Sequence, residues 1–454
     1  MHEPDQPPTD VHLVLLLHGL YGSSANLWCL EEEIERAHAA SDCRLELHTL
    51  NANSYTGALT WDGIDVNAHR VASEVDKEIE CLEQQGRRVT VFSITGYSLG
   101  GLIARALVGE LHARTPSFFA AHRPASFCTI ATPHLGVLRY GSWRSMWVHA
   151  IGQRLFSRTG QQLFCLDTDL GRPLLAQLAD PNDKYLRALN VFPRIVVIAN
   201  AVNDLTVPYA TAAICTHDPF VDHARDCLCV ELEGKTVTRY YKPDPEEDEV
   251  ERELIPSAPA TPQPERADNR PWLPPVFYTN WRGPLRYAVF PFIPFLLPTV
   301  LTIVAVTFAF HSFQSAQRIR LHSEARRRLL AEGPDTPTPI ETPQPSRPVT
   351  PAHLDAEGIS TPPLAPTNPS QPLITPLQQD IIRAFNGLPQ LERIVAWFPG
   401  AFNAHAVIIA RNAHNPRWAF QSEGRDVVQK WARKVVAAVT EALEAPLPAA
   451  EVIS

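Results

Sequence analysis

The N-terminal half of the chain alternates between short apolar runs and longer stretches with apolar positions at helical spacing. An apolar run of strand length without alternation is typical of a parallel strand that is covered on both faces. We expect strands at 11–17, 45–50, 89–95, 127–131 and 194–199, and helices at about 26–38 and 65–85. Strands that alternate with helices predict an α/β protein with a mostly parallel sheet and flanking helices.

Residues 89–105 contain the most specific local pattern. A β-branched apolar run leads into a G-x-S-x-G motif centred on Ser98, and a helical pattern follows. This order of strand, motif and helix predicts a nucleophile elbow, a tight turn that lifts a serine hydroxyl above the sheet edge. Gly96 and Gly100 leave room for strand and helix to approach each other. We expect the amide of Leu99 to point where an oxyanion would form.

A second loop with a possible role follows the strand at 11–17. His18 and Gly19 come directly after this strand, and Leu20 follows them. A strand that ends in His-Gly is where α/β-hydrolases place the other amide of the oxyanion hole, which predicts that role for Leu20. We expect His18 to pack beneath the site rather than to titrate in it.

A serine nucleophile of this type needs an acid and then a histidine later in the chain. Serine is a weak nucleophile at neutral pH and needs a base, and the base needs a carboxylate that holds its tautomer. Asp204 follows the strand at 194–199 and is the candidate acid, with His405 the candidate base. The sequence also offers Asp218 or Asp222 as the acid, and His414, His217 or His223 as the base. We expect His134 to be structural.

The second half of the chain differs in composition. We divide it into an acidic and proline-rich linker at 233–283, an apolar segment with a basic flank at 284–330, a Pro/Thr-rich disordered insertion at 331–376, and a return to order at 377–446. The N-terminal part, 10–232, carries the oxyanion loop, the elbow and the acid. The last part contains His405, a strand expected at 406–410 and an amphipathic helix at 425–443. The predicted fold is therefore assembled from two separated parts of the chain.

Residues 287–310 carry no charge and are long enough to span a bilayer. Ser98 and Asp204 precede this segment, and His405 follows it. A single crossing would place the base on the opposite side of the membrane from the nucleophile, so no triad could form. We therefore expect a hairpin that enters and leaves on the cytosolic side, where arginines that follow the segment meet an anionic surface. The alternatives are a buried core helix or a single span with another base.

Charge, cysteine content and the N-terminal sequence indicate which kinds of ligand and partner are not expected. The formal net charge of −9 is spread along the chain and gives no nucleic-acid footprint. The 8 cysteines are scattered without a C-x-x-C pair, which favours buried reduced thiols over a metal site. The N-terminus has no basic region of the kind that opens a signal peptide. We expect neither a metal nor a cofactor.

Taken together, the motifs resemble the eukaryotic serine esterase family, a lipase-like branch of the α/β-hydrolases with several fungal members. The resemblance covers about residues 10–215 and 377–445. Its motifs are His18-Gly19-Leu20-x-Gly22, Gly96-x-Ser98-Leu99-Gly100-Gly101-Leu102-Ile103-Ala104-Arg105, Ala131-Thr132-Pro133-His134-Leu135-Gly136, Asn203-Asp204-x-x-Val207-Pro208 and Asn403-Ala404-His405. Many members have His where this chain has Tyr97, a position expected to take no part in the chemistry.

The resemblance implies Ser98 as nucleophile, Asp204 as acid and His405 as base. It also implies hydrolysis of acyl esters, in phospholipid or neutral lipid, at an intracellular membrane or lipid-droplet surface. From the resemblance we also expect the protein to be associated with a membrane and to face the cytosol, with the lipid droplet or the endoplasmic reticulum favoured. A thioesterase or protein deacylase on the same fold stays open as an alternative, because the elbow serves all of them. A non-catalytic membrane adaptor is the other alternative.

Overall fold

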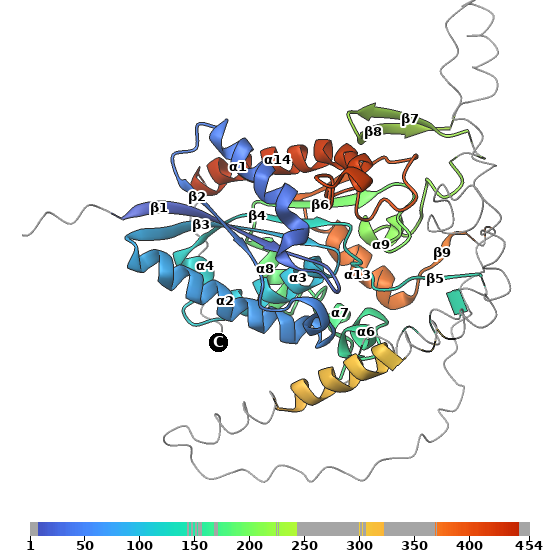
Figure 1. Ribbon diagram of the computed structural model, residues 1–454, viewed down its shortest axis with the longest axis horizontal. Coiled ribbons are helices and arrows are strands. Elements are labelled where there is room, and N and C mark those ends of the chain that lie inside the picture. Colours follow the sequence, from blue (N-terminus) through green and yellow to red (C-terminus); the bar gives the residue numbers. More distant parts are fainter. Residues whose placement is uncertain are drawn as a thin grey trace, which may run out of the picture.

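The computed structural model describes residues 8–142, 157–167, 171–223, 227–242, 306–321 and 370–444, with isolated positions between them (Figure 1). These residues form an 8-stranded sheet in the order β2-β1-β3-β4-β6-β10-β8-β7. The strands are β1 (Thr9–Leu17), β2 (Glu46–Asn51), β3 (Arg87–Tyr97), β4 (Arg123–Ile130), β6 (Arg194–Asn200), β7 (Cys229–Glu233), β8 (Thr236–Tyr241) and β10 (Leu391–Ala396). From β2 to β10 all neighbours are parallel, whereas the hairpin β7–β8 adds antiparallel strands.

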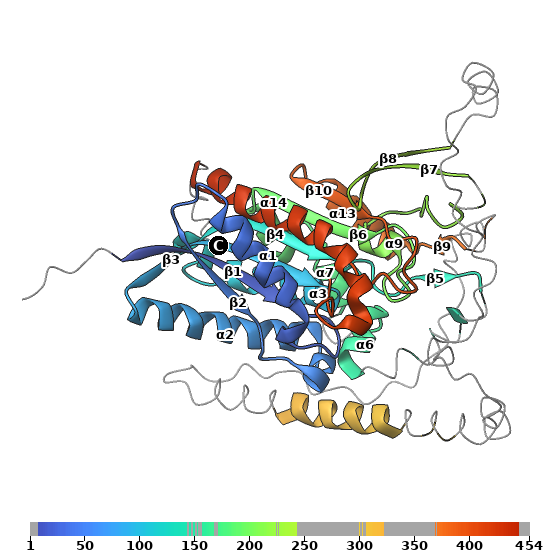
Figure 2. The ribbon, with the colours of Figure 1, turned by 45° about the horizontal axis from the view of Figure 1, so that its top comes forward.

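Helices cover both faces of the sheet (Figures 1 and 2). One face carries α1 (Trp28–Ala39) and α14 (Arg425–Glu444), and the other carries α2 (Ile64–Gln84), α3 (Leu99–His112), α8 (Lys184–Asn190) and α13 (Pro376–Asn386). Shorter elements are η1 (Ser24–Leu27), η2 (Gly57–Trp61), α4 (Phe118–Ala121), α6 (Ser157–Leu163), α7 (Leu174–Gln177), α9 (Tyr209–Ala212) and η6 (Pro416–Gly424), with β5 (Arg139–Tyr140) paired to β9 (Pro372–Leu373). The arrangement is a layered α/β fold, as the sequence predicts.

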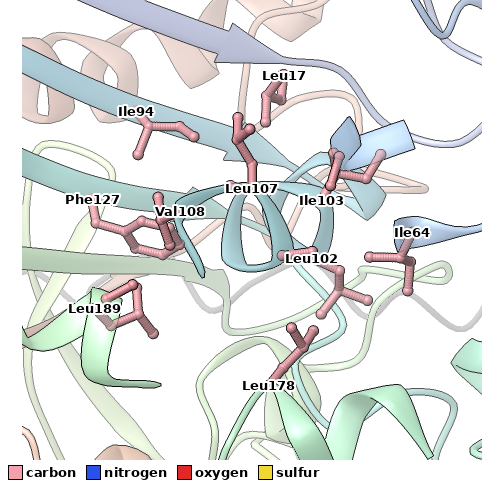
Figure 3. Packing of buried hydrophobic residues seen from close by; sticks show 14 of the residues in the cluster. Leu17, Ile64, Ile94, Leu102, Ile103, Leu107, Val108, Phe127, Leu178 and Leu189 are labelled. Carbon is pink, nitrogen blue, oxygen red and sulfur yellow. The ribbon is translucent and has the colours of Figure 1, made fainter. Parts of the chain in front are cut away.

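The helix that follows the elbow, α3, is buried on nearly all sides. Leu107 points toward the sheet residues Leu17 and Ile94, while Leu102 points away from the sheet toward Leu178 (Figure 3). A helix that is apolar all round belongs in a core. Burying each of these leucines stabilises the fold by roughly 1.5–3 kcal/mol. Packing in the core therefore holds α3, and with it the turn at Ser98, in a fixed position.

Two sequence expectations for the C-terminal half need correction. Residues 406–410 form turns rather than a strand, because their amides bond locally, as from Ile408 to the carbonyl of Ala404 and from Ala410 to the carbonyl of Val407. The apolar side chains of this stretch are buried against α14 instead. Residues 236–241, expected to be linker, form β8 within the sheet. The linker from 243 onward, most of the apolar segment and the insertion up to 367 lie outside the described residues.

A helix at residues 306–321 overlaps the end of the expected membrane segment (Figure 2, gold). It packs on η2, where the Trp61 ring lies 5.1 Å from Phe308 and 5.4 Å from His311, centroid to centroid. Arg318 forms an ion pair with Asp62 at 2.7 Å. In the part of the chain that the structure describes, we find no helix with both the length and the apolarity to cross a bilayer.

Candidate active site

Ser98 sits in a strained turn between β3 and α3. Its backbone has φ 55° and ψ −125°, a conformation that non-glycine residues rarely adopt and that is frequent at functional sites. A β-carbon at Gly96 would lie 2.4 Å from the Cα of Gly101, and one at Gly100 would lie 2.3 Å from the carbonyl oxygen of Leu17. Both contacts are too short for any side chain, so the two glycines are needed for the close approach of strand and helix. The predicted nucleophile elbow is present.

The loop after β1 lies directly against the serine. A β-carbon at Gly19 would lie 2.8 Å from the Cβ of Ser98 and 3.2 Å from its Oγ. Within the described residues, the amides of Leu20 and Leu99 donate no hydrogen bond to backbone or side chains. Two unused amides on the two loops beside the serine are suited to stabilise an oxyanion.

His18 supports this loop from below. Its side chain is fully buried and stacks on Tyr55 with ring centroids 4.2 Å apart. The Tyr55 hydroxyl donates to the carbonyl oxygen of His18 at 2.9 Å. Burial lowers the pKa of His18 below its ordinary value, which favours the neutral imidazole. His18 therefore packs beneath the site, as expected.

Ser98, His405 and Asp204 form a continuous hydrogen-bonded line. The Ser98 Oγ lies 3.0 Å from Nε2 of His405, and Nδ1 of His405 lies 3.0 Å from Oδ2 of Asp204. Ser98 is 6% exposed, and the Asp204 side chain is 1% exposed. The three residues follow β3, β10 and β6, so they meet at the carboxyl ends of parallel strands, where open α/β sheets bind ligands.

The Asp204 carboxylate is held by hydrogen bonds on both oxygens. Oδ1 accepts from the amides of Thr206 and Val207 at 2.9 and 2.8 Å. Oδ2 accepts from Nδ2 of Asn200 at 2.8 Å in addition to facing His405. A carboxylate with these donors keeps one orientation, which fixes the position of the histidine ring.

Two asparagines join the acid loop to the histidine loop. The side-chain oxygen of Asn403 accepts from the amides of His405 and Leu205 at 3.1 and 3.3 Å. The Asn203 side chain donates to the carbonyl oxygens of Phe398 and Pro399, and its own carbonyl accepts from the amide of Ala404. The two loops are thus fixed relative to each other even though they are about 200 residues apart in sequence.

The alternative acids and bases lie elsewhere. Asp218 accepts from the amide of Phe220, and burial raises its pKa to about 6. The Asp222 carboxylate accepts a hydrogen bond from Nδ2 of Asn368. His414 packs edge-on against Trp28, and His223 packs against Trp397. None of these side chains hydrogen-bonds to Ser98, and His217 makes no such bond within the described residues either.

His134 is structural, as expected. It is fully buried, and its Nε2 lies 3.0 Å from the Thr129 hydroxyl. Burial, and then the charge of Arg105, lower its pKa well below the ordinary value. In the described stretches, no group of three or more His, Cys, Asp or Glu side chains is placed to hold a metal ion.

Sequence reasoning missed Tyr97. Its buried hydroxyl donates to the carbonyl oxygen of His405 at 2.8 Å and accepts from Nη2 of Arg411 at 2.8 Å. In the G-x-S-x-G motif the residue before the serine is variable, so the motif does not predict the hydrogen bond between Tyr97 and His405. The asparagines that hold the acid and base loops were part of the motifs, but their hydrogen bonds could not be read from spacing.

The strand order, the strained serine and the three-residue line define an α/β-hydrolase with a serine triad. Residues 7–217 match the model of the family described as “Putative serine esterase (DUF676)”. The resemblance predicted from the motifs is thereby confirmed for this part of the chain.

Two fungal relatives carry the word lipase in their names. “Putative lipase C4A8.10” of Schizosaccharomyces pombe is 29% identical over 208 residues, which are 45% of this chain and 26% of that protein. “Putative lipase ROG1” of Saccharomyces cerevisiae is 29% identical over 212 residues, 46% of this chain and 29% of that protein. The match thus spans less than a third of the length of either relative.

Solved structures with partial similarity include two lipid hydrolases. Phospholipase PlaB from Legionella pneumophila is 15% identical with a TM-score of 0.27, over 44% of this chain and 40% of that chain. A monoacylglycerol lipase from Paleococcus ferrophilus is 14% identical with a TM-score of 0.25, over 44% of this chain and 77% of that chain. The fold assignment rests on the strand order and the site geometry described above.

Proposed function

We propose that the chain is a serine hydrolase that cleaves acyl esters of lipids, either phospholipid or neutral lipid, through an acyl intermediate on Ser98. The observation that carries the proposal is the hydrogen-bonded line from Ser98 through His405 to Asp204, with 3.0 Å at each step. A base within hydrogen-bond reach of the serine, itself oriented by a buried carboxylate, is what acyl transfer to serine requires.

The steps follow from these positions. The Ser98 Oγ attacks the ester carbonyl carbon while Nε2 of His405 takes its proton, and the amides of Leu20 and Leu99 stabilise the oxyanion. His405 then gives the proton to the leaving alcohol, and the acyl group stays on Ser98. A water molecule, deprotonated by His405, then attacks the acyl carbon. The bond from that carbon to the Ser98 Oγ breaks, His405 returns the proton to Oγ, and the fatty acid leaves. Asp204 stabilises the imidazolium that forms in each step.

A lipid substrate is supported by apolar residues beside the site. Tyr21, Leu205 and Phe402 each lie close in sequence to a site residue, on the oxyanion, acid and histidine loops, and they are 61%, 66% and 63% exposed. Exposed apolar groups gathered at a site favour an apolar partner. Both fungal relatives are named lipases, which agrees with this substrate class.

The proposal includes a membrane surface as the place of action. The helix at 306–321 uses one face to contact η2, and apolar side chains of its opposite face are exposed. These are Val306, Phe310, Phe313 and Leu321. An amphipathic helix of this kind is suited to lie in a lipid interface. We propose a cytosol-facing membrane, either a lipid droplet or the endoplasmic reticulum.

The catalytic part is tested with a fluorophosphonate probe and an ester substrate. Wild type is compared with Ser98→Ala, His405→Ala and the control Ser73→Ala, which changes an exposed serine of α2. Labelling and hydrolysis are expected in wild type and Ser73→Ala, and to be lost in the other two. Labelling that persists in Ser98→Ala would refute the nucleophile. Parallel assays on phospholipid, triacylglycerol, thioester and acyl-peptide substrates separate a lipid esterase from the alternatives.

The membrane part is tested by flotation with vesicles of phosphatidylcholine and phosphatidylserine. The double variant Phe310→Asp/Phe313→Asp is expected to float less than wild type, because each aspartate opposes insertion of this face into the interface. Leu443→Asp is the matched control, since Leu443 is an exposed apolar residue at the end of α14. Equal flotation of all three proteins would refute a role of this helix face.

A further inference from the structure

Tyr97 connects the nucleophile strand to the loop that carries the base. It is the last residue of β3 and directly precedes Ser98. Its side chain is buried, and the hydroxyl donates to the main-chain carbonyl oxygen of His405 at 2.8 Å. The tyrosine ring also packs against the imidazole, with centroids 5.1 Å apart. One side chain thus contacts both the backbone and the ring of the base.

Arg411 completes the contact from the other end of the loop. Its Nη2 donates to the Tyr97 hydroxyl at 2.8 Å, and its guanidinium lies 5.3 Å from the centre of the tyrosine ring. Its backbone is fixed as well, because the Arg411 carbonyl accepts from Nε1 of Trp28 at 2.6 Å. The amide of Arg411 donates to the carbonyl of Ala406 at 3.1 Å. The hydroxyl of Tyr97 therefore donates to one end of the histidine loop and accepts from the other.

The histidine loop needs such a contact because it lacks regular structure. Residues 404–414 consist of turns, so no ladder of strand or helix hydrogen bonds fixes the carbonyl of His405. The imidazole must nevertheless keep Nε2 at 3.0 Å from Ser98 and Nδ1 at 3.0 Å from Asp204. Tyr97 and Ser98 are consecutive, so the Tyr97–His405 hydrogen bond ties the backbone of the histidine loop directly to the residue beside the nucleophile.

We propose that Tyr97, oriented by Arg411, is a positioning residue that sets the distance between the base and the nucleophile. This inference rests on the proposed function, since it assigns Tyr97 to the Ser98–His405 proton transfer. Burial raises the pKa of the Tyr97 phenol above its ordinary value, so the hydroxyl keeps the proton that it donates. The amino acid before the nucleophile thus acts in the reaction through the base, without touching the substrate.

Tyr97→Phe tests the role, because it removes one oxygen and keeps the buried ring. We expect kcat to fall about 10- to 100-fold, the effect of a small misplacement of a catalytic group, while KM stays within about twofold. Tyr209→Phe is the matched control, since Tyr209 is another buried tyrosine and lies on α9 outside the site. Its kcat is expected to equal that of wild type. The thermal midpoint of both variants shows how much of any loss comes from unfolding.

Arg411→Gln gives a second route to the same question. It is expected to lower kcat about 3- to 10-fold, and the double variant is expected to lose no more than Tyr97→Phe alone, because both changes act through one hydroxyl. An unchanged kcat in Tyr97→Phe would overturn the proposal, as would a fall matched by the unfolded fraction. Additive losses in the double variant would overturn it as well, and if Tyr97→Phe does not fold, an unchanged kcat in Arg411→Gln would overturn it. Failure of wild type to react with fluorophosphonate would instead refute the proposed function itself.

Discussion

The carboxylate of Asp62 lies 2.7 Å from the guanidinium of Arg318, although the two residues are 256 positions apart in the chain. Asp62 is fully buried and also pairs with Arg70 at 2.6 Å. It ends η2, where the Thr60 hydroxyl accepts from the amide of Tyr21 at 3.0 Å. The helix at 306–321 is therefore linked, through η2, to the loop that carries Leu20.

This link predicts energetic coupling between two distant parts of the chain. Arg318→Ala and Asp62→Asn should each destabilise the protein, and the double variant should lose less than their sum. The coupling free energy is expected to be on the order of 1–3 kcal/mol, since the hydrogen bonds are charged and one partner is buried. Urea unfolding measures the cycle, and hydrogen exchange follows the amides of 306–321. Additive losses with unchanged exchange would show that the helix is not held by this pair.

Gly19→Ala is expected to lower esterase activity strongly without unfolding the protein. The new β-carbon would lie 2.8 Å from the Cβ of Ser98, so the oxyanion loop or the serine must move by several tenths of an ångström. Loss of an oxyanion donor costs about 100- to 1000-fold in kcat. Gly400→Ala is the control, because a β-carbon there has no atom within 4 Å. Steady-state kinetics and circular dichroism of both variants check the expectation, which fails if Gly19→Ala keeps its kcat.

Asp204→Asn tests the acid against its nearest competitor in the sequence. The amides of Thr206 and Val207 hold the asparagine oxygen at the Oδ1 position, so its NH2 group faces Nδ1 of His405 and selects the tautomer with the proton on Nε2. The comparable change in a serine protease lowers kcat about 10,000-fold. We expect a loss of at least about 1000-fold on that basis. Asp218→Asn keeps an acceptor for the amide of Phe220 and is expected to retain full activity. Similar losses in both variants would contradict the assignment of the acid.

Acid is expected to destabilise the fold through buried histidines. His12 lies in β1 with Nε2 2.8 Å from the Ser93 hydroxyl, and burial lowers its pKa from 6.5 to about 3. The unfolded chain binds this proton below pH 6.5 and the folded chain only near pH 3, so stability falls as the pH falls through this window. Linkage predicts a loss of about 2 kcal/mol from this group between pH 7 and pH 5.

His12→Gln should remove that part of the pH dependence. The glutamine side chain does not titrate, and His18 and His134 are unchanged in both proteins. Urea unfolding of wild type and variant at pH 7 and pH 5 measures the difference. The expectation fails if the two proteins lose the same free energy of unfolding over this range.

Part of the site could be predicted from sequence because its residues follow apolar strands, whereas the choice of His405 as base came from the family resemblance. Ser98, Asp204 and Leu20 come directly after β3, β6 and β1, and the edge of a parallel sheet brings such positions together. The predicted strand at 406–410 was wrong for a related reason. A buried apolar run of this length has the same pattern as a strand, and the local hydrogen bonds that make turns of it, such as that from the amide of Ala410 to the carbonyl of Val407, leave no mark in the pattern.

Tyr97 and Asn403 show where sequence reasoning ends. Tyr97 contacts His405 across 308 positions of sequence, whereas Asn403 contacts it from two positions away within one loop. Neither contact follows from a periodic pattern. The hairpin β7–β8 was missed because its second strand begins where the composition turns polar. The partner of β8 in the sheet, β10, lies more than 100 positions later in the chain, so no local pattern indicates their pairing.

Lys242 directly follows β8 and Asn368 precedes β9, and both residues line one cavity of about 460 Å³. Asn368 bonds to Asp222 there, and Gln371 donates to the carbonyl of Asp218 at 2.7 Å. The two ends of the segment 243–367 thus lie at one corner of the described hydrolase fold. The entropy of closing a loop grows only with the logarithm of its length. A linker of sufficient length could join these two ends without separating Ser98 from His405, but it would remove the Arg318–Asp62 ion pair, so the support beneath the oxyanion loop cannot be exchanged apart from this segment.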